Sequence, residues 1–149
     1  MTRFIRWILG LIAAALVTYV VGTALNAQSV IAMHDISVSI GDRLNMTLFD
    51  ISNMVAYLAI VAIALLIGFL IATLLKRFLP NLARIAYPIA GAAAIAVVLG
   101  AMYMVFQTIP ISGARSTMGF LSQVLAGAIG GWVFARIVVQ RVTPAKAGV

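Results

Sequence analysis

The stretch MVAYLAIVAIALLIGFLIATLL (residues 54–75) contains no charged side chain and lies between Asp50 and Lys76. A helix needs about 20 mostly apolar residues to cross the hydrocarbon core of a bilayer, which is about 30 Å thick. This stretch has that length and that composition. It therefore predicts a transmembrane helix, and it sets the criterion by which the rest of the chain is read.

Three other stretches meet the same criterion and leave no room for a second domain. The chain of 149 residues is 64% hydrophobic and 9% charged, whereas soluble domains are about 45–50% apolar and about 25% charged. We therefore expect an all-α membrane protein, a single four-transmembrane-helix bundle formed by residues 1–149. The predicted spans are residues 7–25, 54–75, 85–106 and 119–139, and the first outer loop is residues 26–53.

The basic residues are concentrated on one side of the predicted membrane. If successive spans alternate in direction, most of the ten Lys and Arg residues flank the chain ends and the second loop. Because cytoplasmic loops carry an excess of Lys and Arg, both termini are expected in the cytoplasm, with the bundle in an inner or plasma membrane. Anionic membrane lipid explains the net charge of +7, so nucleic acid is not an expected partner. The residues on this side are Arg3, Arg6, Lys76, Arg77, Arg84, Arg136, Arg141 and Lys146.

Small residues recur at intervals of four in each predicted span. Such stripes let the backbones of neighbouring transmembrane helices approach closely, which is a main source of helix association in lipid. We therefore expect them at helix contacts. A second small stripe in residues 119–139, which contains Gly127 and Gly131, is expected to face another subunit and predicts a homo-oligomer or a larger membrane complex. The predicted packing residues are Gly10, Ala64, Gly68, Ala72, Gly100, Ala126 and Gly130.

The outer loop, residues 26–53, contains a pattern that two structures can explain. Apolar residues alternate with polar ones in residues 36–40 and again in residues 44–48, and Gly41 and Asp42 favour a turn between them. This pattern predicts a β-hairpin that lays its apolar face over the bundle. A short amphipathic interfacial helix over residues 44–51 is the alternative, because a two-residue period over five residues is a weak signal.

Uncharged polar side chains enter the spans mainly in their outer halves. If these side chains converge, they form an outward-facing pocket for a neutral or amphipathic ligand, such as a lipid. The alternative is a belt of interfacial tyrosines together with hydrogen bonds between helices. The candidate ligand-binding residues are Thr18, Tyr19, Thr23, Tyr57, Tyr103, Gln107, Ser122 and Gln123.

No motif in the chain assigns it a reaction. No Asp, Glu, Lys or His lies in the middle of a span, although proton-coupled transporters generally need such groups. His34 and the three Asp residues of the outer loop have no recognised metal-ligand spacing, so no catalytic residue, metal site or cofactor is assigned. We expect a non-enzymatic protein that acts through helix packing, as an assembly, scaffold or accessory component of a membrane complex. An oligomeric transporter or channel subunit is the alternative, and a lipid-acting enzyme is a more distant one.

Overall fold

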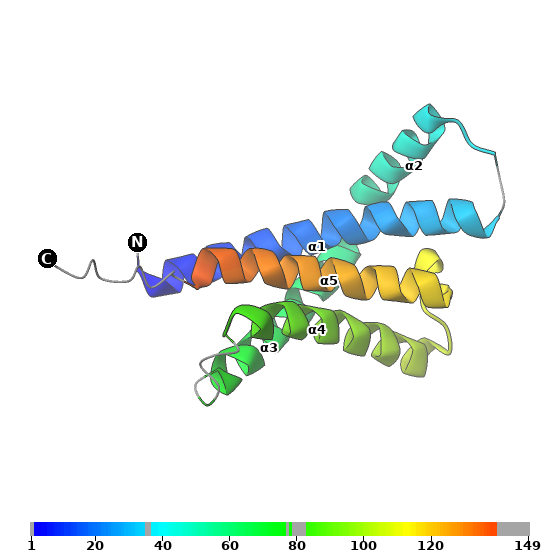
Figure 1. The fold of residues 1–149 in the computed structure, drawn as a ribbon. Coiled ribbons are helices and arrows are strands. Elements are labelled where there is room, and N and C mark those ends of the chain that lie inside the picture. Colours follow the sequence, from blue (N-terminus) through cyan, green and yellow to red (C-terminus); the bar gives the residue numbers. More distant parts are fainter. Residues whose placement is uncertain (1, 35–36, 77, 79–82, 140–149) are drawn as a thin grey trace, which may run out of the picture.

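The computed structural model describes residues 2–34, 37–76, 78 and 83–139, and within these ranges it contains helices and no strand (Figure 1). Four of the helices are long and apolar enough to cross a membrane. Within the described ranges, a short helix and one 3-10 turn lie between them. The elements are α1 (Arg3–Met33), α2 (Ile40–Asn53), α3 (Val55–Leu75), α4 (Ala83–Phe106), η2 (Ser112–Arg115) and α5 (Thr117–Val138).

Helix α5 lies between α1 and α4, and α3 packs against α4 and α1 (Figure 1). The beginning of α1 and the end of α5 lie at the same end of the bundle, called here the terminal end. At this end, the Arg6 guanidinium donates a hydrogen bond of 2.7 Å to the carbonyl oxygen of Ile137, which joins the two helices. The opposite end carries α2 and η2 and is called the α2 end.

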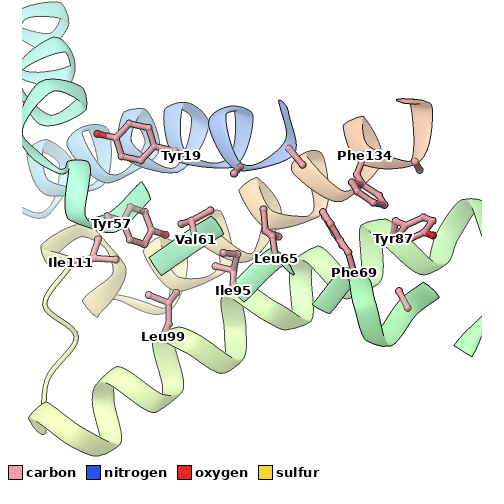
Figure 2. Packing of buried hydrophobic residues seen from close by; sticks show 14 of the residues in the cluster. Tyr19, Tyr57, Val61, Leu65, Phe69, Tyr87, Ile95, Leu99, Ile111 and Phe134 are labelled. Carbon is pink, nitrogen blue, oxygen red and sulfur yellow. The ribbon is translucent and has the colours of Figure 1, made fainter. Parts of the chain in front are cut away.

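The core changes in character along the bundle. Towards the terminal end it consists of aromatic rings: Phe69 stacks on Phe134 at 4.2 Å between ring centroids, and Tyr87 packs against both (Figure 2). Leu65 and Ile95 fill the middle and have no exposed surface. The core at the terminal end is therefore closely packed and mostly apolar.

Glycines on two sides of α5 permit its close contacts with α1 and α4. A Cβ atom placed on Gly130 would lie 2.8 Å from the carbonyl oxygen of Ala14 on α1. On the other side, a Cβ on Gly127 would lie 2.6 Å from the Cγ1 atom of Ile95 on α4 and closer still to the Gly91 carbonyl oxygen. Both small stripes of α5 are therefore used within one chain. The expectation that the second stripe faces another subunit is wrong, and it no longer supports an oligomer.

The first outer loop contains a helix, α2. The prediction of a β-hairpin in this loop is therefore wrong. The Ser39 hydroxyl accepts a hydrogen bond of 3.2 Å from the Asp42 N–H and caps the first turn of α2. Ile40, Leu44 and Leu48 are separated by four residues, a spacing that fits a helix as well as a two-residue alternation. The alternative helix over residues 44–51 is correct in type, but α2 is longer at both ends.

Helix α1 also continues beyond the predicted end of the first span at residue 25. Ala27 and Ile31 are buried and extend the stripe of residues that faces the bundle, so the helix gains contacts by continuing to Met33. Asn26, which the sequence analysis places in the loop, is inside this helix. As a result, the bundle has a projecting helical end against which α2 packs (Figure 1).

Candidate functional site

Buried polar side chains gather at the α2 end of the bundle, where three helices exchange hydrogen bonds. The Gln123 amide on α5 donates a bond of 2.8 Å to the carbonyl oxygen of Gly22 on α1. The Tyr57 hydroxyl on α3 donates one of 3.0 Å to the Oε1 atom of Gln123. Gln123 therefore connects α5 to both α1 and α3, with only 1% of its surface exposed.

Tyr19 lies beside this group and extends it towards α2. Its ring is 6.4 Å from that of Tyr57 (Figure 2), and its hydroxyl donates a hydrogen bond to the carbonyl oxygen of Ile51. Both rings are buried and neither points outwards into a peripheral belt. Of the eight candidate ligand-binding residues, Tyr19, Tyr57 and Gln123 are thus brought together, as the sequence analysis anticipates for a convergent group.

Thr18 and Thr23 are also buried, but their side chains have a different environment. Neither hydroxyl has a hydrogen-bond partner among the described residues, although both side chains are at most 1% exposed. Thr18 packs against Gly130 on α5. The two residues fill space between helices, and their hydroxyl groups contribute no bond to the group around Gln123.

Three of the candidate residues lie outside the group, and their expected place in an outer pocket is wrong. Tyr103 is 56% exposed on α4. Gln107 is exposed, and with φ of 54° it adopts the left-handed conformation that ends α4, where its amide donates to the Met104 carbonyl. Ser122 bonds back to Gly119 within its own helix, so its hydroxyl does not reach a neighbour.

Asn26 is a polar connection that the sequence analysis missed. Its amide nitrogen donates to the Asp50 carboxylate of α2 at 3.2 Å, and its side-chain oxygen accepts from the Gly113 N–H of η2 at 2.8 Å. One side chain thus ties α1 to two segments that are distant in sequence. One feature of the sequence could have indicated this connection: Asn26 is a polar residue at the end of an apolar run. It follows Gly22 by four residues and so lies on the same face of the helix.

The group around Gln123 is suited to joining helices. Its groups are uncharged, and the amide of Gln123 uses its oxygen and its nitrogen in bonds to other helices. In the described part of the chain, no three His, Cys, Asp or Glu residues are close enough to hold a metal ion. The geometry therefore supports interhelical hydrogen bonding, the alternative given for these residues in the sequence analysis.

A groove on the outside of the bundle, between α3 and α4, is the second candidate site. It has a volume of about 760 Å³ and runs along α3 from Ile60 to Lys76. Among the residues that line it, Lys76 is the one with a polar side chain. The groove is lined by the α3 residues Ile60, Ile63, Ala64, Ile67, Gly68, Ile71, Ala72, Leu75 and Lys76 and by the α4 residues Ala86, Ile89, Ala90, Ala93, Ala94, Val97, Val98 and Ala101.

The groove is lined by small residues and by large branched apolar ones from both helices. Gly68 lets α3 approach α4, since a Cβ on it would lie 3.1 Å from both the Ala90 carbonyl oxygen and the Ala94 Cβ. Ile67 and Val97 lie along the groove and are 54% and 71% exposed. Branched apolar side chains thus form much of the wall of the groove.

The predicted packing residues occupy several different places. Gly10 lies against Phe134 and Val138 of α5, while Ala126 is fully buried. Ala64, Gly68 and Ala72 line the groove. Gly100 is not at a helix contact, because a Cβ on it would meet no described atom within 4 Å. Its expected packing role is therefore wrong.

Comparison of the chain with protein-family models, with curated proteins and with solved structures gives no match. A function must therefore be inferred from the two sites themselves. The group around Gln123 is held by bonds between helices, whereas the groove between α3 and α4 has exposed lining residues such as Ile67 and Val97.

Proposed function

We propose that this protein is a non-enzymatic component of a membrane complex, an accessory or scaffold subunit that acts through helix packing. In this proposal, the groove between α3 and α4 receives a transmembrane helix of a partner protein. The terminal end faces the cytoplasm and the membrane is an inner or plasma membrane, as the distribution of basic residues indicates. The open groove is the observation that carries the proposal.

The length of the groove supports a helix as its occupant. At about 1.5 Å of rise per residue, the stretch of α3 from Ile60 to Lys76 covers about 24 Å, which is most of the hydrocarbon thickness of about 30 Å. An acyl chain of a single leaflet would cover about half of that thickness. A transmembrane helix of the partner would be in contact over the whole length of the groove.

The composition of the groove supports the same occupant. Lipid tails are as apolar as leucine, so helices associate in a bilayer where their backbones and side chains can pack closely. Gly68, Ala90 and Ala94 serve the contact between α3 and α4, while Ala64 on α3 and Ala93 on α4 leave small side chains in the groove that permit the approach of a partner helix.

The interior of the bundle supports a role at its surface. At the α2 end, Gln123 is bonded to Tyr57 and to the main chain of Gly22, and the terminal end is filled by the rings of Phe69, Tyr87 and Phe134. A transporter would have to open a path through these rings or form one between subunits. The transporter or channel subunit therefore remains the second proposal, and a flux measurement distinguishes it.

Site-specific crosslinking in cells tests the proposal. A photoreactive benzoylphenylalanine at Val97, in the groove, should form an adduct of one defined mass, whereas the same probe at Leu121, exposed on α5, should not. The matched variant Ala93→Trp fills the groove and should abolish the Val97 adduct while the protein level stays unchanged. The crosslinked peptide of the partner, identified by mass spectrometry, should come from a transmembrane segment.

Two results would contradict a helix-binding groove. Equal adducts from Val97 and Leu121 would mean that the groove is no more occupied than the rest of the lipid-facing surface. Solute flux through proteoliposomes containing the purified chain, lost in the Gln123→Leu variant, would instead favour the transporter proposal.

A further inference from the structure

Helix α2 turns one polar side, formed by Arg43, Thr47 and Asp50, towards α1. The Arg43 guanidinium donates a hydrogen bond of 2.9 Å to the side-chain oxygen of Gln28, whose amide donates one of 3.3 Å to the Thr47 hydroxyl. Asn26 adds the bond to Asp50. Within the described residues, these bonds fix the rotation of α2 about its own axis.

With this rotation, α2 exposes an apolar stripe. Ile40 is 80% exposed, and Leu44 and Leu48 are each 60% exposed. Because they are spaced by four residues, the three side chains lie in a row along one side of the helix. Asn45 and Ser52 are exposed on another side, where Phe49, one turn from Asn45, is also exposed. Such a row of large apolar side chains would be unfavourable in water.

The position of α2 along the bundle indicates what covers the stripe. Its bonds to Asn26 and Gln28 place it where the apolar run of α1 gives way to polar residues, which is the boundary of the hydrocarbon region. Its other end is joined to α3 by Met54 alone, and it runs obliquely to α1 (Figure 1). Both attachments thus hold α2 at a membrane surface, where amphipathic helices bury their apolar side about 5–10 Å deep.

We propose that α2 is an interfacial helix, with Ile40, Leu44 and Leu48 inserted among the lipids of the leaflet at the α2 end. Its polar side stays against the projecting end of α1, and Asn45 faces the water. This inference concerns lipid only and is independent of the groove between α3 and α4. Because α2 and α3 are separated by one residue, lipid insertion of α2 also sets the depth of α3 in the membrane.

Spin-label accessibility tests this inference, and the absence of cysteine from the sequence makes each label unique. Leu44→Cys, Leu48→Cys and the matched control Asn45→Cys are labelled in the purified chain and reconstituted in phosphatidylcholine and phosphatidylglycerol vesicles. Collision with oxygen reports lipid, and collision with a water-soluble nickel chelate reports water. The ratio of oxygen to nickel collisions should be several-fold higher at residues 44 and 48 than at residue 45.

Two outcomes would overturn the inference. Equal ratios at the three positions would place the whole helix in water or at the level of the headgroups. Labels at residues 44 and 48 that are shielded from both reagents would show that protein covers the stripe, and relief of this shielding on dilution with lipid would identify a second copy. Unchanged elution of each labelled variant in size-exclusion chromatography excludes unfolding as the cause of either result.

Discussion

The side-chain amide of Gln123 donates its hydrogen bond to the main chain of Gly22, not to another side chain. The bond is available because Gly22 has no side chain in the way: a Cβ on Gly22 would lie 2.7 Å from the Oε1 atom of Gln123. A glycine and a glutamine on helices far apart in the sequence are therefore matched in shape and in polarity. This pairing makes the stability of the bundle sensitive to either residue.

The Gln123→Leu variant should unfold at a lower temperature than the unchanged protein. It removes the bonds to Gly22 and Tyr57 and leaves the buried Tyr57 hydroxyl without its partner, which should cost about 1–3 kcal/mol. Thermal unfolding in mild detergent measures the loss. Ser122→Ala is the matched control, because Ser122 bonds within its own helix. Equal stability of the two variants would show that the bonds of Gln123 are energetically neutral.

Two glycine substitutions should differ strongly in their effect. Gly127→Ala places a methyl group against the Gly91 carbonyl of α4, and this overpacking should cost about 1–3 kcal/mol. Gly100→Ala puts the same group into open space and should be neutral or stabilising by up to about 1 kcal/mol, because alanine favours a helix. Unfolding in detergent compares the two. A similar loss in both variants would contradict the close contact between α4 and α5.

Thr18→Val and Thr23→Val should each leave stability unchanged or raise it slightly. Both hydroxyls are buried without a partner among the described residues, and valine has the same branched shape without the polar atom. The measurement is again thermal unfolding in detergent, with Tyr57→Phe as a variant that loses a real bond. A large loss of stability in either Thr variant would reveal that its hydroxyl binds a water molecule or a ligand.

The Asn26→Leu variant should loosen the α2 end without opening the whole bundle. It removes the bonds from α1 to Asp50 and to Gly113, while the aromatic core at the terminal end is unaffected. Amide hydrogen exchange should therefore rise in residues 108–116 and in α2, and stay unchanged in residues 61–69 of α3. Asn53→Ala, which affects only a bond within α2, is the control. Uniform exchange along the chain would contradict a local role.

The orientation of the chain remains a prediction from its charges, and thiol labelling tests it. Single cysteines at Ser37, beside α2, and at Ala147, which lies outside the described residues, should react oppositely with an impermeant reagent in intact cells. Ser37→Cys should label and Ala147→Cys should label only after lysis. The reverse pattern would place the α2 end in the cytoplasm.

The sequence predicted the four long apolar helices, because length and charge-free composition are local properties. It did not predict the path of residues 26–53. Ile40, Leu44 and Leu48 fit both a two-residue alternation and a helix, and the deciding signal was the cap formed by Ser39 and Asp42. This cap marks the beginning of a helix, whereas Gly41 and Asp42 were read as a turn.

The candidate site was predicted only in part, since convergence depends on the rotation of each helix. Tyr19, Tyr57 and Gln123 come together because each lies on the buried side of its helix. Tyr103 occurs at a similar depth but points away from the bundle, and no local pattern distinguishes it from Tyr57. Asn26 was missed because its partners, Asp50 and Gly113, are far away in sequence.

The contact between α1 and α5 has a consequence for the synthesis of the protein. Chains are made at about 5–20 residues per second, so α5 follows α1 by roughly 5–20 seconds. During this interval, Thr18 and Asn26 on α1 lack Gly130 of α5 and Gly113 of η2, which they contact in the complete fold. Helix α1 therefore has a partly polar, uncovered surface until α5 is made. If residues 117–138 were not completed, this surface would stay exposed and could be recognised by quality-control proteases.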